Sequence, residues 1–243
     1  MSAVTFIADL HLRPEAPAGM EALARLLAAL PAGDALWILG DLFEFWAGRE
    51  HARRPDYRPA LDAIRAAAAR GVEVRFLGGN RDFLLDAGTQ RELGMKPFTG
   101  RETVLEAQGR RIYLAHGDFL CPNDRAYLRA AALLRNPVSL WIERRLPFPL
   151  AYRAAAAFRR LSEAKRGKGP APAGTYELSE AMLAEVADRL GVDDLVIGHV
   201  HTPVDRPVAG TAKPAALHVL DPWHGDRAPF LRLEDGAFRR ASA

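Results

Sequence analysis

Acidic, amide and imidazole side chains recur along the chain in five short clusters, four of which contain glycine. The clusters are Asp9-Leu10-His11, Gly40-Asp41, Gly79-Asn80-Arg81-Asp82, His116-Gly117-Asp118 and Gly198-His199-Val200-His201. Imidazole nitrogens and carboxylate or amide oxygens suit divalent ions such as Mn, Fe, Co or Zn. The clusters therefore predict a metal centre with seven candidate ligands, which are Asp9, His11, Asp41, Asn80, His116, His199 and His201.

Seven ligands are more than one tetrahedral site needs. They suit two ions about 3.5–4 Å apart that share a carboxylate, the arrangement that stabilises the attacking and leaving oxygens in phosphoryl hydrolysis. Asp9 and His11 can bind one ion together, because residues i and i+2 of a strand face the same way. Each cluster alone could have a purely structural role, as a turn or as a hydrogen-bonded core histidine. The ordered set is what indicates a metal-dependent hydrolase.

The elements that must position these clusters are short apolar runs of the kind that form buried strands. Such runs cover residues 4–8, 35–39 and 72–77, and helical spacing of apolar residues covers 20–30 and 59–70 between them. Strands and helices that alternate in this way predict an α/β core with parallel strands. Because the carboxyl ends of parallel strands lie at one edge of a sheet, the clusters should meet there.

The second half of the chain has a different pattern. Residues 102–105 and 111–115 flank a predicted hairpin turn at 107–110, and a helix is expected at 179–190. The remaining expected strands lie at 195–197, 216–220 and 230–233. The expected organisation is one domain over residues 1–243 with an inserted, basic helical cap over about 124–170.

The cap segment carries most of the excess positive charge. From Arg129 to Lys168 there are ten Lys or Arg against two acidic residues, a net charge of +8, whereas the whole chain is only +3. A local basic field implies an anionic partner. The segment is helical in composition, with breaks expected at Pro137, Pro147 and Pro149, and a Gly- and Pro-rich loop at 167–174.

Composition excludes several classes of protein. Apolar residues make up 49% of the 243 residues, which excludes disorder over the whole length. The single cysteine, Cys121, excludes an internal disulfide and a cysteine-based zinc cluster. The sequence contains no run of about 18 apolar residues, so no membrane-spanning helix is predicted. The start of the chain lacks the basic segment of a signal peptide, so the expected location is cytoplasmic.

The ordered motifs resemble those of the calcineurin-like metallophosphoesterase superfamily, and the match extends from Asp9 to His201. The resemblance implies a four-layer α/β/β/α sandwich with a two-metal site. The implied ligands are Asp9, His11 and His201 for the first ion, Asn80, His116 and His199 for the second, and Asp41 as the bridge.

Longer strings at residues 6–12, 38–44 and 79–85 narrow the resemblance. They are similar to a branch of the superfamily that hydrolyses UDP-2,3-diacylglucosamine in lipid A synthesis. That branch has Arg in place of the usual His after Gly-Asn, and Arg81 stands at this position here. The branch also has a helical cap after His-Gly-Asp, where this chain has its basic helical segment. The resemblance implies cleavage to UMP and 2,3-diacylglucosamine 1-phosphate by a metal-bridged hydroxide that attacks the α-phosphorus, with Mn²⁺ as the typical ion.

The resemblance also implies roles for single residues. Arg81 would hold phosphate oxygens through its guanidinium, and Asp82 and Asp118 would orient metal-binding histidines. The implied catalytic residues are Asn80, Arg81 and His116. The implied substrate-binding residues are Arg81, Asp124, Tyr127, Ser162, Lys168 and His199. Candidates for an acyl-chain groove, or equally for packing within the cap, are Trp46, Trp141, Phe148, Tyr152 and Phe158.

Three other functions remain open from the sequence. The segment 161–168 is poorer in Asn and Ser than the branch, which favours as one alternative a dinuclear hydrolase of a soluble nucleotide or other phosphoester. A metal-binding scaffold without turnover is a second, although its ligand set is intact. Nucleic-acid binding rests on the basic segment alone, so no nucleic-acid partner is expected. The expected partners are a UDP-linked diacylglucosamine lipid and the anionic cytoplasmic face of the inner membrane.

Overall fold

The computed structural model describes residues 2–143, 145–166 and 176–243, with side chains at all of these except 126, 137 and 158–166. Its strands form two five-stranded sheets. The first sheet contains, in spatial order, β10 (Ala237–Ser242), β9 (Pro229–Glu234), β1 (Val4–Ile7), β2 (Ala35–Ile38) and β3 (Glu73–Phe76). The second contains β4 (Glu102–Ala107), β5 (Arg110–Ala115), β6 (Asp194–Ile197), β8 (Ala216–Val219) and β7 (Val204–Pro207).

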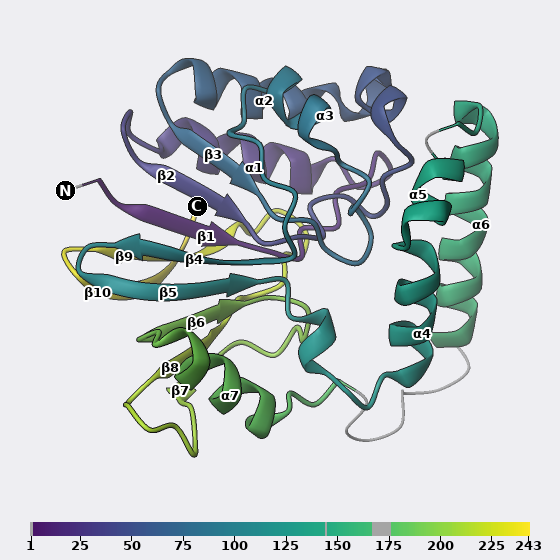
Figure 1. Ribbon diagram of the computed structural model, residues 1–243. Coiled ribbons are helices and arrows are strands. Elements are labelled where there is room, and N and C mark those ends of the chain that lie inside the picture. The colour runs from purple at the N-terminus through teal and green to yellow at the C-terminus, as the bar shows by residue number, and fades with distance from the viewer. Residues whose placement is uncertain (1, 144, 167–175) are drawn as a thin grey trace.

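Helices cover the outer faces of both sheets (Figure 1). The helices over the first sheet are α1 (Ala18–Ala29), α2 (Arg58–Ala69) and α3 (Ala87–Glu92), and α7 (Glu180–Leu190) packs on the second. Three further helices stand beside the sandwich, and together we call them the cap: α4 (Arg125–Leu134), α5 (Pro137–Glu143) and α6 (Phe148–Arg166). Short 3₁₀ turns occur at Arg49–Arg53, Pro55–Tyr57 and Asp118–Leu120.

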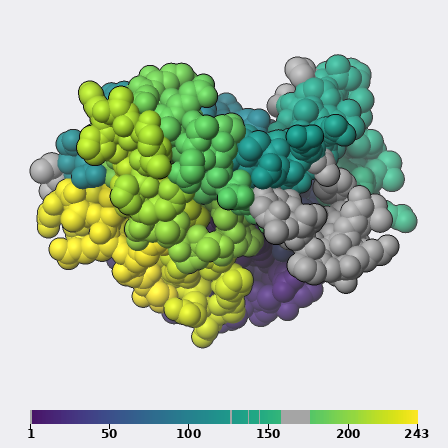
Figure 2. Space-filling view, turned by 90° about the horizontal axis from the view of Figure 1, so that it is seen from below, coloured from purple at the N-terminus to yellow at the C-terminus, as the bar shows by residue number. Residues whose placement is uncertain are grey.

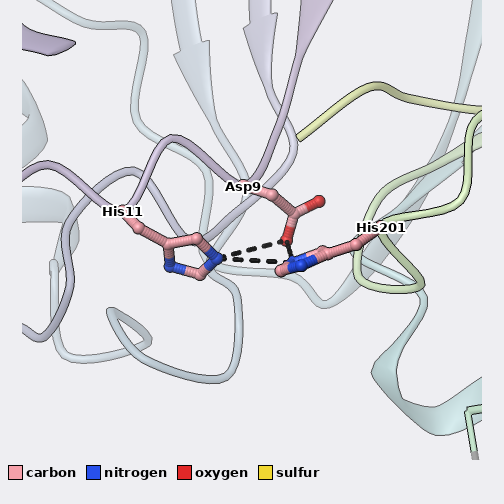
Figure 3. Close-up of side chains that lie close together, drawn as sticks. All are labelled: Asp9, His11 and His201. Carbon is pink, nitrogen blue, oxygen red and sulfur yellow. Dashed lines mark hydrogen bonds and ion pairs between the residues drawn. The ribbon is translucent and has the colours of Figure 1, made fainter. Parts of the chain in front are cut away.

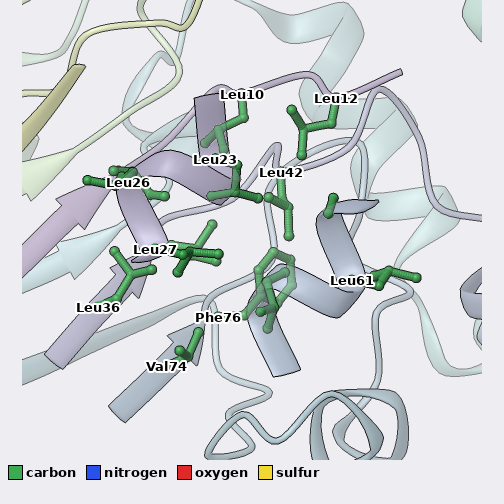
Figure 4. Close-up of a cluster of buried hydrophobic side chains, with 14 of the residues drawn as sticks. Leu10, Leu12, Leu23, Leu26, Leu27, Leu36, Leu42, Leu61, Val74 and Phe76 are labelled. Atoms are coloured by element: carbon green, nitrogen blue, oxygen red, sulfur yellow. The ribbon is translucent and has the colours of Figure 1, made fainter. Parts of the chain in front are cut away.

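Three apolar clusters fill the spaces between these layers. One joins α1 and α2 to the first sheet through residues such as Leu23, Leu26 and Phe76 (Figure 4). A second lies between the two sheets, and a third joins the second sheet to α7. Full burial of one such side chain stabilises the fold by about 1.5–3 kcal/mol. The layers therefore run helix, sheet, sheet, helix, which confirms the predicted four-layer sandwich.

Parallel pairing brings the ends of the central strands to one level. Ile7 lies opposite Ile38, and Ile38 lies opposite Phe76 in the first sheet. In the second sheet, Ala115 lies opposite Ile197. Each of these residues ends its strand, so the loops that carry the polar clusters begin side by side.

The sequence misses three elements and locates most of the others to within two or three residues. The predicted hairpin has its turn at Gln108 and Gly109, with φ of 51° and 78°. The missed elements are α3, β7 and β10. An Asp235-Gly236 turn, with φ of 50° and 74°, precedes β10 and is a strong hairpin signal that the apolar pattern alone does not use.

The cap lies beside the edge of the sandwich where the strands end, and in the space-filling view it forms a lobe at one side (Figures 1 and 2). The predicted breaks are confirmed, because α4 ends at Leu134 before Pro137, and α5 ends at Glu143 before Pro147 and Pro149. Pro137 is the first residue of α5, and Pro149 is the second residue of α6. Proline suits the first turn of a helix because its missing N–H would have no partner there. The predicted loop at 167–174 lies outside the described residues.

Candidate metal centre

The structure brings the seven candidate ligands together from five loops. Asp9 and His11 follow β1, Asp41 follows β2 and Asn80 follows β3. From the second sheet, His116 follows β5, and His199 and His201 follow β6. The site therefore lies where the carboxyl ends of both sheets meet, beside the cap (Figure 1).

Asp9, His11 and His201 form one group of ligand atoms (Figure 3). The Nε2 atoms of the two histidines are 3.4 Å apart, and Asp9 Oδ1 is 3.2 Å from His201 Nε2 and 4.0 Å from His11 Nε2. Three donor atoms thus face one point from three directions. This is the geometry that one divalent ion requires from part of its ligand shell.

A second group surrounds Asp41. Asp41 Oδ1 lies 3.7 Å from His116 Nε2, and Asp41 Oδ2 lies 3.9 Å from His11 Nδ1. Asn80 Oδ1 is 3.0 Å from His116 Nε2, and the His199 ring centroid is 5.1 Å from that of His116. The Asp41 carboxylate therefore lies between a histidine of each group, as a bridging ligand must.

The polar atoms of the site fit divalent cations. His11 Nδ1 and His199 Nε2 are buried, and each lacks a hydrogen-bond partner. His116 Nδ1 lies 2.9 Å from the Leu39 carbonyl, and an N–H there leaves a lone pair on Nε2. The Asn80 amide faces both that Nε2 and the Asp41 carboxylate, and with its NH₂ group on this side it donates to Asp41 Oδ2 at 2.7 Å and to His116 Nε2 at 3.0 Å. The two unpartnered histidine nitrogens and the lone pair on His116 Nε2 therefore suit a cation.

Most of the candidate ligands have a strained backbone. Among the described residues, seven other than glycine have a positive φ in the left-handed region. Two of these lie in hairpin turns, and the other five are Asp9, His11, Asp41, His199 and His201, with φ between 47° and 69°. Such conformations cost on the order of 1 kcal/mol or more each and concentrate at functional sites. The strain turns each side chain toward the common point.

Two glycines permit the close approach of the loops. A Cβ on Gly79 would lie 2.2 Å from Asp41 Oδ1, and one on Gly198 would lie 2.5 Å from Asp9 Oδ2. Atoms do not approach so closely without a shift of the backbone. Gly79 and Gly198 are therefore part of the site, although they have no functional side chain.

Burial sets the charge of the ligands. It lowers the pKa of His11 and of His199 to about 3, aided by Arg81 and His116 respectively, so both imidazoles are neutral and able to bind metal at pH 7. Burial alone would raise the pKa of Asp9, but the hydrogen bond to His201 and the nearby histidines lower it to about 2. Burial raises the pKa of Asp41 to about 7, with a contribution from Asp82 and Asp9. Crowded carboxylates of this kind attract a cation.

The Asp82 carboxylate binds backbone N–H groups of the site, so the prediction that it orients a metal-binding histidine is wrong. Its carboxylate accepts hydrogen bonds from the backbone N–H groups of Asp41, Leu42, Phe43 and Gly79, at 2.7–3.3 Å. The Leu39 carbonyl, and not Asp82 or Asp118, is the partner of His116 Nδ1. Asp82 thereby ties the loop after β2 to the loop after β3.

We expect Asp82→Ala to lower the free energy of unfolding of the metal-free protein by about 3 kcal/mol or more, because buried N–H groups lose their acceptor. Urea unfolding followed by circular dichroism measures this. The matched control is Asp62→Ala, which removes an exposed carboxylate paired with Arg65 and should cost less than about 0.5 kcal/mol. Equal stability of the two variants would contradict the assignment of Asp82.

The Arg81 guanidinium pairs with the Glu44 carboxylate. Its Nε is also 3.5 Å from Asp41 Oδ2, and its backbone N–H donates to Asp41 Oδ1 at 3.0 Å. Glu44 is buried and follows the Gly40-Asp41 cluster, and the sequence motifs predict no role for it. Its acidic type and its place three residues after Asp41 are the signals that could have revealed it.

The predicted substrate residues of the cap have structural partners as well. Asp124 caps α4 by accepting from the backbone N–H of Tyr127 at 3.1 Å. The Tyr127 hydroxyl donates to Asp118, and the Tyr127 ring lies 6.0 Å from that of His199. The side chain of Ser162, and all of Lys168, lie outside the described residues, so their roles stay predictions.

The aromatic candidates for an acyl groove divide into two kinds. Trp46 is buried and stacks on the His51 ring at 4.7 Å, so it belongs to the core. Phe148 and Tyr152 of α6 pack against His51, where they join the cap to the core. Trp141 is 56% exposed. Phe158 is a residue whose side chain the structure does not describe.

A sandwich of two sheets with histidine, aspartate and asparagine gathered at one edge defines a metal-dependent hydrolase of phosphate esters. The sequence profile of the calcineurin-like phosphoesterase family matches residues 2–203. The chain therefore belongs to the calcineurin-like phosphoesterase family, as the motifs indicate. An archaeal phosphodiesterase of known structure has the same fold, with a TM-score of 0.50 and 10% identity over 99% of both chains.

Two relatives are more similar in sequence. A protein from Escherichia coli O17:K52:H18 named UDP-2,3-diacylglucosamine hydrolase is 36% identical over 224 residues, which is 91% of both chains. A protein of the same name from Chromobacterium violaceum is 36% identical over 241 residues, covering 98% of this chain and 97% of the relative. Both matches cover more than nine-tenths of this chain.

Proposed function

We propose that this chain is a two-metal pyrophosphate hydrolase that cleaves UDP-2,3-diacylglucosamine to UMP and 2,3-diacylglucosamine 1-phosphate. The observation that carries the proposal is the Asp41 carboxylate, which lies between His11 and His116 with one oxygen toward each. The relatives named for this hydrolysis match the chain over nearly its whole length. Two Mn²⁺ ions are the proposed cofactors.

Different residues of the chain would bind the two ions and the phosphate group. Asp9, His11 and His201 would hold one ion, and Asn80, His116 and His199 the other, with Asp41 shared. When bound, the ions would supply an activated water and neutralise charge on the phosphoryl oxygens. Arg81 would hold a phosphate oxygen next to them, since a guanidinium has five N–H donors and the pair with Glu44 uses only part of this set.

The cap would provide the remaining substrate contacts. Tyr127 lies beside His199, and Asp124 begins the same helix, so α4 forms one border of the site. We propose Arg81, Asp124, Tyr127, Ser162, Lys168 and His199 as substrate-binding residues, and Asn80, Arg81 and His116 as catalytic ones. The proposed organisation is a single domain with the cap inserted into it.

The direct test is UMP release from UDP-2,3-diacylglucosamine by the purified protein, with Mn²⁺ and with excess EDTA. Bis(p-nitrophenyl) phosphate serves as a generic diester. We expect fast, metal-dependent UMP release and slow cleavage of the generic diester. Metal-dependent cleavage of the generic diester alone would assign the same centre to a soluble phosphoester. UMP release that persists in EDTA would refute a metal-dependent mechanism.

We also propose that the cap contacts an anionic membrane surface. No described helix is both long and apolar enough to span a bilayer. All the exposed large hydrophobic side chains of the described residues lie in the cap segment, and we call them the cap patch: Leu133, Val138, Trp141, Ile142, Leu146 and Leu150. Arg145 lies over the Trp141 ring, 4.0 Å from its centroid, so positive charge borders the cap patch. Apolar side chains edged by arginine suit a surface of anionic lipid.

We expect a Trp141→Glu, Ile142→Glu variant to bind vesicles of phosphatidylglycerol and phosphatidylethanolamine at least about tenfold more weakly than wild type, because apolar area is lost and negative charge is gained. Vesicle sedimentation measures this. The control, Ala66→Glu with Ala69→Glu, adds the same charge at exposed positions of α2 and should bind as wild type does. Equal loss in both variants would mean that net charge, and not the cap patch, controls binding.

A further inference from the structure

The ligands of the proposed second ion come from two different sheets. Asn80 follows β3 of the first sheet, whereas His116 and His199 follow β5 and β6 of the second. Within the second sheet, the backbone N–H of Gly198 donates to the His116 carbonyl at 2.9 Å. Strand pairing therefore sets the spacing of loops within one sheet. It does not set the distance between Asn80 and His116.

Arg135, at the end of α4 in the cap, links these two loops. Its Nη2 donates to the carbonyl of Gly79 at 2.7 Å, and this carbonyl belongs to the peptide that leads into Asn80. The same Nη2 is 3.6 Å from Asp118 Oδ2, two residues after His116. Its guanidinium carbon lies over the Phe83 ring, 5.0 Å from the centroid, and only 13% of its side chain is exposed. One cap residue thus contacts both loops of the proposed second metal site.

Asp118 is the anchor on the second-sheet side. It is buried and accepts from the Tyr127 hydroxyl of α4 and from Arg101 Nη2 at 3.2 Å. Two cap residues, Tyr127 and Arg135, therefore reach the same carboxylate, and Arg135 alone of these also holds Gly79.

The backbone of Gly79 has little other freedom. Its N–H donates to Asp82 Oδ1 at 2.9 Å, and its Cα is packed so closely on Asp41 that no Cβ would fit. With Arg135 on the Gly79 carbonyl, this residue is held at its N–H, its Cα and its carbonyl. Arg is suited to this position because its planar guanidinium can donate to a carbonyl and a carboxylate at the same time. A lysine ammonium does this less well.

We propose that Arg135 is a positioning residue for the second metal ion. It would set the spacing of Asn80 and His116 and make the affinity for that ion depend on where the cap lies. The inference rests on the metal centre of the proposed function. Residues that support metal ligands without touching the metal typically account for about 10–100-fold in affinity. Arg135 should therefore affect one ion and not the other.

The test is calorimetric titration of the metal-free protein with Mn²⁺ in two backgrounds. In His11→Ala, which keeps the second site, we expect Arg135→Ala to weaken Mn²⁺ binding by about tenfold or more. In Asn80→Ala, which keeps the first site, the same substitution should change the affinity less than twofold. Arg135→Lys, which retains the charge and can reach one acceptor, should give an intermediate loss. Arg101→Ala, which removes another partner of Asp118 but not of Gly79, should leave both sites unchanged.

Three results would overturn the inference. If Arg135→Ala weakens both sites equally and also lowers the melting temperature of the metal-free protein, Arg135 has a general structural role. If affinity is unchanged in both backgrounds, Arg135 does not position a ligand. Wild-type protein that binds no Mn²⁺ would refute the proposed function itself, and the inference would fall with it. Normal binding by wild type and Arg135→Ala alike would refute the inference alone.

Discussion

Asp41→Ala is expected to lose on the order of a thousandfold in kcat for UMP release, equal to about 4 kcal/mol of transition-state stabilisation. The Asp41 carboxylate lies between His11 and His116, at 3.9 and 3.7 Å. Without it, the ions would lose a shared ligand and the fixed spacing that lets them act on the same phosphoryl group. We expect the affinity for at least one ion to fall in parallel.

A matched pair of variants separates this effect from misfolding. Asp41→Asn keeps the shape of the side chain and should lose nearly as much activity, because a neutral amide is a poor bridge between cations. The metal-free form of this variant should melt no lower than wild type, since Asp9 and Asp41 bring two buried carboxylates within 4.8 Å of each other. Asp41→Asn with more than a tenth of wild-type kcat would contradict the bridging role.

Gly79→Ala is expected to lower kcat by about a hundredfold, although it removes no functional group. The new Cβ would lie 2.2 Å from Asp41 Oδ1 and 2.4 Å from Asp41 N, so either the bridging carboxylate or the loop before Asn80 must shift. A displacement of about 1 Å in a reacting group can cost a factor of about a hundred. Steady-state UMP release, with Mn²⁺ affinity measured in parallel, tests this expectation.

Gly88→Ala is the control for the added methyl group. Gly88 lies in α3, and a Cβ there would meet only the Asp86 side chain within 4 Å, at 3.3 Å or more. It should therefore retain activity within about twofold, and alanine favours the helix by about 1 kcal/mol over glycine. Equal activity of the Gly79 and Gly88 variants would show that the site tolerates movement of the Gly79 loop.

The order of the layers could be read from the sequence because buried parallel strands leave short apolar runs. The runs at residues 4–8, 35–39 and 72–77 become β1, β2 and β3. The apolar pattern does not predict α3 and β10, for two different reasons. α3 is a short helix, with only Thr89 and Gln90 buried, that begins at the Asp86 cap, and β10 is an exposed edge strand with a weak apolar pattern.

The gathering of the ligand-type residues could be predicted for a physical reason as well. Each cluster follows a strand, and parallel strands bring their carboxyl ends together. The left-handed backbone of Asp9, His11 and Asp41 could not be predicted, because only the loop contacts impose it. The same holds for the roles of Glu44 and Arg135. Their partners, Arg81 and the Gly79 carbonyl, come from another loop or another layer.

The cap shows where sequence patterns mislead. The prolines are not the misleading part: α4 ends before Pro137 and α6 begins at Phe148, so the predicted breaks are confirmed, and Pro137 and Pro149 each stand in the first turn of the next helix. The apolar residues there look like a core, yet Trp141 and Leu133 are 56% and 68% exposed. Periodicity reports that a helix has an apolar face. It does not report whether protein, lipid or water meets that face.

The central claim is a two-metal centre bridged by Asp41, and anomalous diffraction tests it most directly. Crystals grown with Mn²⁺ and measured at the manganese edge should show two peaks, about 3.5–4 Å apart, on either side of the Asp41 carboxylate. The first should lie among Asp9, His11 and His201, and the second among Asn80, His116 and His199. A single peak at full occupancy, or peaks away from Asp41, would contradict the account.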